Sequence, residues 1–171
     1  MVKIKIITVF CVLLITSLLA NVKYNRDHQP QPILTSNSIS GPPCIQLFDA
    51  IEKYAKKYNI PLQYAYNVAY CETRYHGPMH WDYDPHKTSC AGAVGPMQII
   101  PSTAGFINKE KNVSSEKLKN NLDYNVETSM KYIRYLKDRY HSWDIVFGYY
   151  NTGRPIVNDY ARNVINRELN F

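Results

Sequence analysis

One carboxylic acid in this sequence is expected in an apolar setting that would change its chemistry. A helix is predicted over residues 62–74, and four of its side chains share one face at spacings of i, i+3, i+4 and i+7: Ala65, Val68, Ala69 and Glu72. An ionised carboxylate is costly to place among aliphatic groups, so Glu72 should favour its protonated form, which a general acid must hold near neutral pH. The ordinary alternative is a helix-end glutamate that faces solvent or pairs with Arg74.

Four short motifs occur in a fixed order from this glutamate onward. They are Glu72-Thr73-Arg74-Tyr75, the segment 89–99 (Ser-Cys-Ala-Gly-Ala-Val-Gly-Pro-Met-Gln-Ile), Pro101-Ser102-Thr103-Ala104, and Tyr149-Tyr150-Asn151-Thr152-Gly153. In type and order they resemble the lytic transglycosylase family, which shares a lysozyme-like fold with the goose-type lysozymes. Each motif alone is weak. Their common order, over residues 45–169, makes chance similarity a poor explanation.

The resemblance implies an enzyme that cleaves peptidoglycan with one carboxyl group and no cofactor. In that reaction Glu72 protonates the glycosidic oxygen between N-acetylmuramic acid and N-acetylglucosamine, then takes the proton of the muramoyl 6-hydroxyl, and a 1,6-anhydro ring forms. A group that serves first as acid and then as base needs a pKa near the working pH and a dry pocket. By the same resemblance, the residues that line the substrate cleft are Ser89, Met97, Gln98, Tyr150, Asn151 and Tyr160.

Two other functions fit the same motifs. Goose-type lysozymes hydrolyse this bond and carry aspartates in the corresponding loop, so Asp82 or Asp84 could hold a water molecule for hydrolysis. A non-catalytic wall-binding or assembly protein that has kept the groove is the second alternative, and the retained Glu72 argues against it. The loop after Glu72 is several residues longer than is usual in the family, so segment 76–88 is treated as an insertion.

A metal site in the inserted loop is not favoured. It would be built from His76, His80 and His86 with one of the two aspartates. Gly77 and Pro78 interrupt the helix that would present the first two histidines together, and loop histidines are usually solvated. No metal is therefore predicted.

Three cysteines lie outside the N-terminal apolar segment, and export would permit one disulfide among them. The resemblance favours Cys71 with Cys90, because Cys90 belongs to the motif that the family packs beside the acid. Cys44 competes, since it begins the first helix of an antiparallel pair that turns near residues 59–61 and so approaches Cys71. One thiol would remain unpaired.

The remaining pattern is mainly helical. Apolar residues recur at three- and four-residue steps between Leu47 and Tyr58, and helical patterns resume after Pro101. The longest helix is predicted over 123–140 with Asp123 as its cap, followed by helices over 143–150 and 155–168. No repeat or alternating strand pattern occurs. We therefore expect a lysozyme-like helical domain with an active-site cleft and a long loop, or a small hairpin, after the catalytic helix.

The N-terminal part differs in composition from the rest. Lys3 and Lys5 precede an apolar run, so residues 1–20 are predicted to be a signal peptide or signal anchor, with residues 6–20 as the anchoring stretch in an inner membrane. Residues 21–43, rich in Pro, Gln and Ser, are predicted to be a flexible linker, and residues 44–171 the catalytic domain. These features predict an exported protein of the periplasm or cell envelope.

Charge and composition limit the partners. The 171 residues include 20 basic and 14 acidic side chains, a net charge of +6 that becomes +4 without Lys3 and Lys5. No Lys/Arg stripe occurs on any segment, so nucleic acid is not expected as a partner, whereas an anionic polymer such as the cell wall would be weakly attracted. The expected partners are peptidoglycan strands, with a secretion, conjugation or phage machine as the wider setting. Contact with a membrane is expected only through the N-terminal segment.

Overall fold

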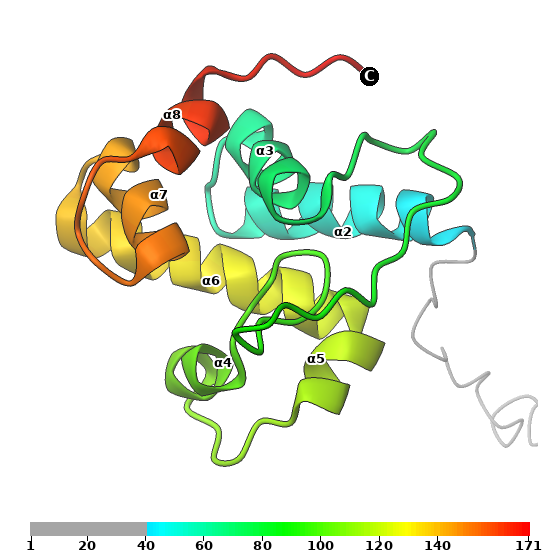
Figure 1. The fold of residues 1–171 in the computed structure, drawn as a ribbon, viewed down its shortest axis with the longest axis horizontal. Helices are drawn as coiled ribbons and strands as arrows, with labels where there is room; N and C mark the ends of the chain where they lie inside the picture. Colours follow the sequence, from blue (N-terminus) through cyan, green and yellow to red (C-terminus); the bar gives the residue numbers. More distant parts are fainter. Residues whose placement is uncertain (1–40) are drawn as a thin grey trace, which may run out of the picture. The chain divides into compact units, whose positions relative to one another are not determined.

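The structure is a computed structural model that describes residues 41–171 (Figure 1). The predicted signal segment and residues 21–40 of the predicted linker lie outside this part. Within it the helices are α2 (Pro43–Lys57), α3 (Leu62–Thr73), α4 (Pro101–Asn108), α5 (Ser115–Asn120), α6 (Leu122–Tyr140), α7 (Trp143–Thr152) and α8 (Asp159–Asn166). The mainly α prediction is confirmed. In the described residues, no helix is long and apolar enough to cross a membrane.

Helix α6 is the central element of the fold. It packs against α2, α4, α5 and α7 (Figure 1), and the apolar face predicted for it is fully buried: Val126, Met130, Ile133 and Leu136. The predicted cap of this helix was wrong. Asn121 is the cap, because its side chain accepts a hydrogen bond from the Tyr124 amide at 2.9 Å. Asp123 instead accepts bonds from α2.

Two similar polar trios join α2 to α6 one helical turn apart. Asp123 Oδ1 accepts hydrogen bonds from Lys53 Nζ at 2.9 Å and from the Tyr54 hydroxyl at 2.7 Å. One turn later, Glu127 Oε1 accepts in the same way from Lys57 and Tyr58, both at 2.7 Å. Because i and i+4 residues lie on one helix face, the two trios set the register of the two helices.

The last helix is shorter than predicted. The spacing suggested residues 155–168, yet α8 begins at Asp159, where the Asn158 side chain accepts the Ala161 amide at 2.9 Å. The segment before it passes so close to α7 that a Cβ on Gly148 would lie 1.6 Å from the Ile156 carbonyl oxygen. Pro155 lies in a bend between the two helices, and proline is tolerated in a bend as well as at a helix start, so it gave a false starting point.

The loop between α3 and α4 carries the sheet-like part of residues 41–171. Two isolated antiparallel bridges, Thr88 with Val94 and Val94 with Ile99, take the place of the expected small hairpin. Val94 is fully buried and serves both bridges. This pairing folds the motif of residues 89–99 back toward the end of α3.

Candidate active site

Glu72 lies at the C-terminal end of α3 and faces α8. The hydroxyl group of Tyr160, on α8, donates a hydrogen bond to Glu72 Oε1 at 2.6 Å. The helix ends one residue later, and Arg74 adopts a left-handed conformation with φ of 60°. The packing of α3 against α8 therefore brings together two residues that are 88 positions apart.

The environment of Glu72 favours its protonated form. Burial raises the pKa of this carboxyl above its usual range, while the Tyr160 hydrogen bond and the positive charge of Lys87 act in the opposite direction. Lys87 Nζ donates to the backbone carbonyl oxygen of Glu72 at 2.7 Å, so its charge stays beside the site. The predicted direction of the pKa shift is thus present in the structure, and the partner of the carboxylate is Tyr160 rather than Arg74.

The residue after the acid ties three segments together. The Thr73 hydroxyl oxygen lies 3.0 Å from the Ala69 carbonyl oxygen, 3.2 Å from that of Pro96 and 2.9 Å from the Tyr83 hydroxyl. Tyr83 belongs to the inserted loop and is buried. The insertion is therefore anchored directly beside Glu72 and is not a detached surface loop.

A buried amide holds the second motif against α6. Asn125 Oδ1 accepts a hydrogen bond from the Met97 amide at 3.2 Å, and its Nδ2 donates to the carbonyl oxygens of Val94 at 2.8 Å and Leu118 at 3.2 Å. Gly95 leaves the room for this side chain, because a Cβ there would lie 2.4 Å from Asn125 Nδ2. Sequence reasoning missed Asn125, and the polar residue within the apolar face of α6 was the signal that could have found it.

Several residues that were predicted to line the cleft form hydrogen bonds with other groups of the protein. The Tyr150 hydroxyl donates to the Met97 carbonyl oxygen at 2.7 Å and lies 2.9 Å from Ser129 Oγ. Ser89 Oγ accepts the Ala93 amide, and Gln98 Nε2 donates to the Gly95 carbonyl oxygen at 2.8 Å. Met97, which was also predicted to line the cleft, is fully buried, so its side chain lies in the core.

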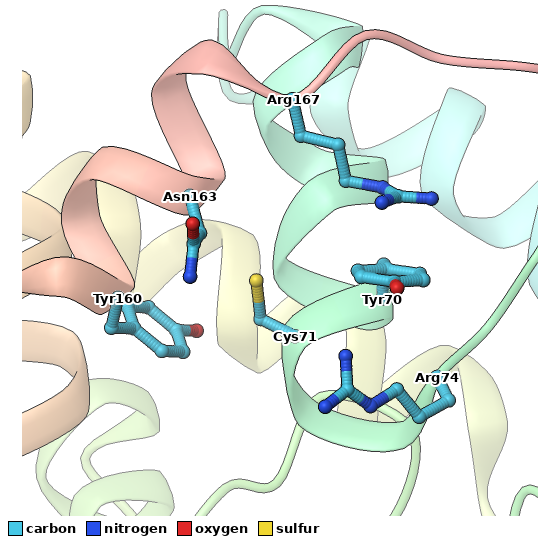
Figure 2. A pocket seen from close by; sticks show the side chains of 6 residues that line it. All are labelled: Tyr70, Cys71, Arg74, Tyr160, Asn163 and Arg167. Atoms are coloured by element: carbon cyan, nitrogen blue, oxygen red, sulfur yellow. The ribbon is translucent and has the colours of Figure 1, made fainter.

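Two cavities lie near the acid. One, of about 240 Å³, is lined in part by Gln98, Tyr150 and Asn151. The other, of about 410 Å³, is lined by Tyr70, Cys71, Arg74, Tyr160, Asn163 and Arg167 (Figure 2). Each is lined by a tyrosine that interacts with Glu72. Tyr160 donates a hydrogen bond to Glu72. The pKa of Tyr150 is raised by burial and also by the negative charge of Glu72. Of the six residues that line the larger cavity, the sequence analysis singled out only Tyr160 and Cys71 as site residues. The helical spacing of Tyr160, Asn163 and Arg167 was the signal that could have grouped these three on one face.

The loop carboxylates proposed for hydrolysis are exposed. The side chains of Asp82 and Asp84 are 94% and 75% accessible, and their oxygens lie 3.5 Å and 3.2 Å from ring nitrogens of His80 and His86 respectively. In residues 41–171 no three His, Cys, Asp or Glu side chains gather as a metal site. Both aspartates thus lie beside histidines of their own loop, and neither is buried.

The expected disulfide is not formed. Cys44, Cys71 and Cys90 are all free thiols, with Cys44 buried and Cys90 exposed. Cys44 lies inside the core, where its carbonyl oxygen accepts the Tyr75 hydroxyl at 2.6 Å. Cys71 lines the larger cavity instead.

Solved structures of known proteins resemble this chain over about two thirds of its length. The chain is similar to the 70-kDa soluble lytic transglycosylase in complex with bulgecin A, at 26% identity and a TM-score of 0.51 over 68% of this chain and 18% of that one. It is also similar to the soluble lytic transglycosylase of Escherichia coli, at 26% identity and a TM-score of 0.49 over the same shares. No curated protein matches the chain.

The first likeness confirms the expected lysozyme-like helical fold. Because only 18% of each relative is covered, this chain corresponds to about a fifth of those proteins. The family model described as "Transglycosylase SLT domain" matches residues 49–170, which include all the helices from α3 to α8 and most of α2. The chain therefore belongs to the transglycosylase SLT domain family.

Proposed function

We propose that this protein cleaves the β-1,4 bond between N-acetylmuramic acid and N-acetylglucosamine in peptidoglycan without consuming water. The observation that carries the proposal is the 2.6 Å hydrogen bond from the Tyr160 hydroxyl to a half-buried Glu72 whose pKa is raised by burial. Membership of the family and the names of its relatives, which are lytic transglycosylases, support the same substrate.

In this proposal Glu72 acts twice. It first donates its proton to the glycosidic oxygen, and the resulting carboxylate then removes the proton of the muramoyl 6-hydroxyl, which attacks C1 and closes the 1,6-anhydro ring. Tyr160 stabilises the carboxylate between the two steps, since its hydroxyl donates to the charged form. A nucleophile that is already attached to the sugar needs no second carboxylate to position it.

Hydrolysis remains the competing reaction, and the loop geometry argues against it. A general base for water should lie within hydrogen-bond reach of the reacting centre. Asp82 and Asp84 are largely solvent-exposed and lie beside histidines of the same loop, so neither has the buried setting of Glu72.

Mass spectrometry of muropeptides released from purified peptidoglycan tests the proposal, because anhydro and hydrated ends differ by one water. We expect anhydro ends from the wild type and loss of cleavage in a folded Glu72→Gln variant. Asp82→Asn and Asp84→Asn should each retain at least about a tenth of the activity, since loss of a required general base typically costs about a hundredfold or more. Reducing ends together with a hundredfold loss in either aspartate variant would identify a lysozyme.

The substrate also indicates where the protein works. Peptidoglycan lies outside the cytoplasmic membrane, so we propose that the protein is exported to the periplasm or cell envelope and that residues 1–20 direct it there. A secretion, conjugation or phage machine remains the proposed wider setting. Fractionation of cells that produce the full chain, with immunodetection of each fraction, tests the location, and a purely cytoplasmic protein would contradict it.

A further inference from the structure

The larger cavity beside Glu72 contains two arginines without an acidic partner. We call this cavity the arginine pocket and define it by the six residues that line it: Tyr70, Cys71, Arg74, Tyr160, Asn163 and Arg167. Within residues 41–171, no ion pair involves Arg74 or Arg167. A concave surface with two free guanidinium groups is suited to an anionic ligand.

Both guanidinium groups are arranged around the ring of Tyr70. The Arg167 Cζ lies 3.3 Å and the Arg74 Cζ 5.3 Å from the ring centroid, and in Figure 2 the ring lies between them. An arginine stacked on an aromatic face keeps its in-plane N–H groups available. The stacking therefore orients donors that match the two oxygens of a carboxylate.

The backbone that carries each arginine is held in place. The Arg167 carbonyl oxygen accepts hydrogen bonds from Gln63 Nε2 at 2.9 Å and Asn67 Nδ2 at 2.8 Å, so α3 fixes the turn after α8. Arg74 occupies a left-handed position at the end of α3, and its amide donates to the Tyr70 carbonyl oxygen at 2.8 Å. A non-glycine residue in this conformation is uncommon and costs energy, which the surrounding contacts offset. A preorganised site loses less entropy on binding.

The arginine pocket shares one residue, Tyr160, with the proposed catalytic site. Tyr160 lines it and also donates to Glu72, and Cys71 immediately precedes Glu72 in the chain. We propose that the arginine pocket binds a carboxylate of the peptide that is attached to the muramoyl residue of peptidoglycan, and this inference rests on the proposed function. That peptide is joined to the lactyl group of the sugar on which Glu72 would act, and it carries free carboxylates. Asn163 supplies a neutral side chain able to donate to the same ligand.

The test compares three glycan substrates of the same length. One carries peptides with free carboxylates, one carries peptides whose carboxylates are amidated, and one has had its peptides removed by an amidase. For the wild type we expect kcat/KM on the first substrate to exceed that on the other two by about tenfold or more. Arg74→Gln and Arg167→Gln should each abolish most of this preference, measured within each variant as the ratio of kcat/KM on the first substrate to kcat/KM on the peptide-free strands.

Two controls separate charge recognition from folding. Arg162→Gln alters an exposed arginine of α8 that pairs with Asp159, and it should keep the wild-type preference. Arg167→Lys keeps the charge without the planar fork, so it should retain part of the preference. Circular dichroism and thermal midpoints confirm that each variant is folded, and Arg74→Gln alone decides the matter if Arg167→Gln is unfolded.

The outcomes distinguish this inference from the proposed function. Equal rates on all three substrates, or a uniform loss on all three in the arginine variants, would overturn the peptide site even if anhydro products form. If the wild type gives no anhydro products, the proposed function fails. Binding of the same three substrates to the Glu72→Gln variant then decides the pocket, because tighter binding of the carboxylate-bearing strands supports the site and equal affinity refutes it.

Discussion

The contact between Tyr160 and Glu72 controls the proton that the proposed reaction needs. Burial of the carboxyl raises its pKa, and the hydroxyl group lowers it by donating to the charged form. The two effects act on one oxygen, since the bond is to Oε1. Their balance should set the pH range of activity.

Tyr160→Phe should therefore shift the pH profile. Without the hydroxyl the ionised form loses a stabilising bond, so the pKa of Glu72 rises further and the high-pH limb of kcat/KM moves upward. We also expect a fall of about tenfold or more in kcat/KM, the usual range for a lost hydrogen bond to a charged group. Tyr149→Phe, on a tyrosine that packs against Tyr140, is the matched control and should leave the profile in place. An unshifted limb in Tyr160→Phe would show that another group titrates.

The raised pKa of Glu72 also has a cost in stability. Below about pH 4 both the folded and the unfolded chain hold the proton, so the pKa shift has no effect on folding. As the pH rises, the unfolded chain releases its proton first, and the folded state is penalised. Glu72→Gln should consequently raise the thermal midpoint at pH 7 by about 2–4 °C, roughly the effect of 1 kcal/mol, and the gain should vanish near pH 3. Calorimetry at both pH values checks this, and an equal gain at both would point to packing.

At the scale of elements, the loop after α3 depends on α6. The motif of residues 94–97 has little regular structure of its own, with two bridges at Val94, and is held by the buried amide of Asn125. Buried backbone groups need such partners, because an unpaired one is costly. The proposed catalytic site is therefore supported from a helix that contributes no residue to the arginine pocket.

Asn125→Ala tests this support. The substitution leaves the Met97 amide without its partner and removes a donor from the carbonyl oxygens of Val94 and Leu118, so we expect the free energy of unfolding to fall by about 2–4 kcal/mol. Activity should fall as well in the folded fraction, because the segment next to Tyr150 loses its anchor. Asn120→Ala, on an exposed residue of α5, should change stability by less than about 0.5 kcal/mol. Urea denaturation of both variants gives the comparison, and similar midpoints would refute the anchoring role.

At the scale of the whole molecule, residues 41–171 contain the buried core and the candidate site. Helix α2 begins at Pro43, one residue before the predicted domain boundary, and it buries Cys44 and Leu47 completely. Its two polar trios and its apolar face join it to α6. The boundary between essential and dispensable chain should therefore be sharp near residue 42.

A chain shortened to start at Gly41 should keep its activity on soluble glycan strands within about twofold, because it retains the packed residues. A chain shortened to start at Phe48 loses the buried Cys44 and Leu47, and it should be unfolded or strongly destabilised. Limited proteolysis and turnover of the two proteins test the contrast. A tenfold loss in the first would show that residues 1–40 contribute to the site.

The local pattern was enough to predict the helical class, the apolar face of α6 and the special position of Glu72, because helical periodicity alone decides which residues share a face. The local pattern also led to errors where it allowed two assignments. Asp123 and Asn121 can both cap a helix, and Pro155 suits a helix start and a bend alike. In each case a contact with another element decided the outcome.

The tertiary structure alone decided which polar groups meet. Tyr160 reaches Glu72 only through the packing of α8 on α3, and Arg167 reaches Tyr70 only because side chains of α3 hold the turn after α8. The same packing left Cys71 and Cys90 as free thiols, with Cys90 exposed and Cys71 lining the arginine pocket. Residue type and spacing determine what each side chain can do, whereas its charge state and partners depend on distances between segments that are far apart in the chain.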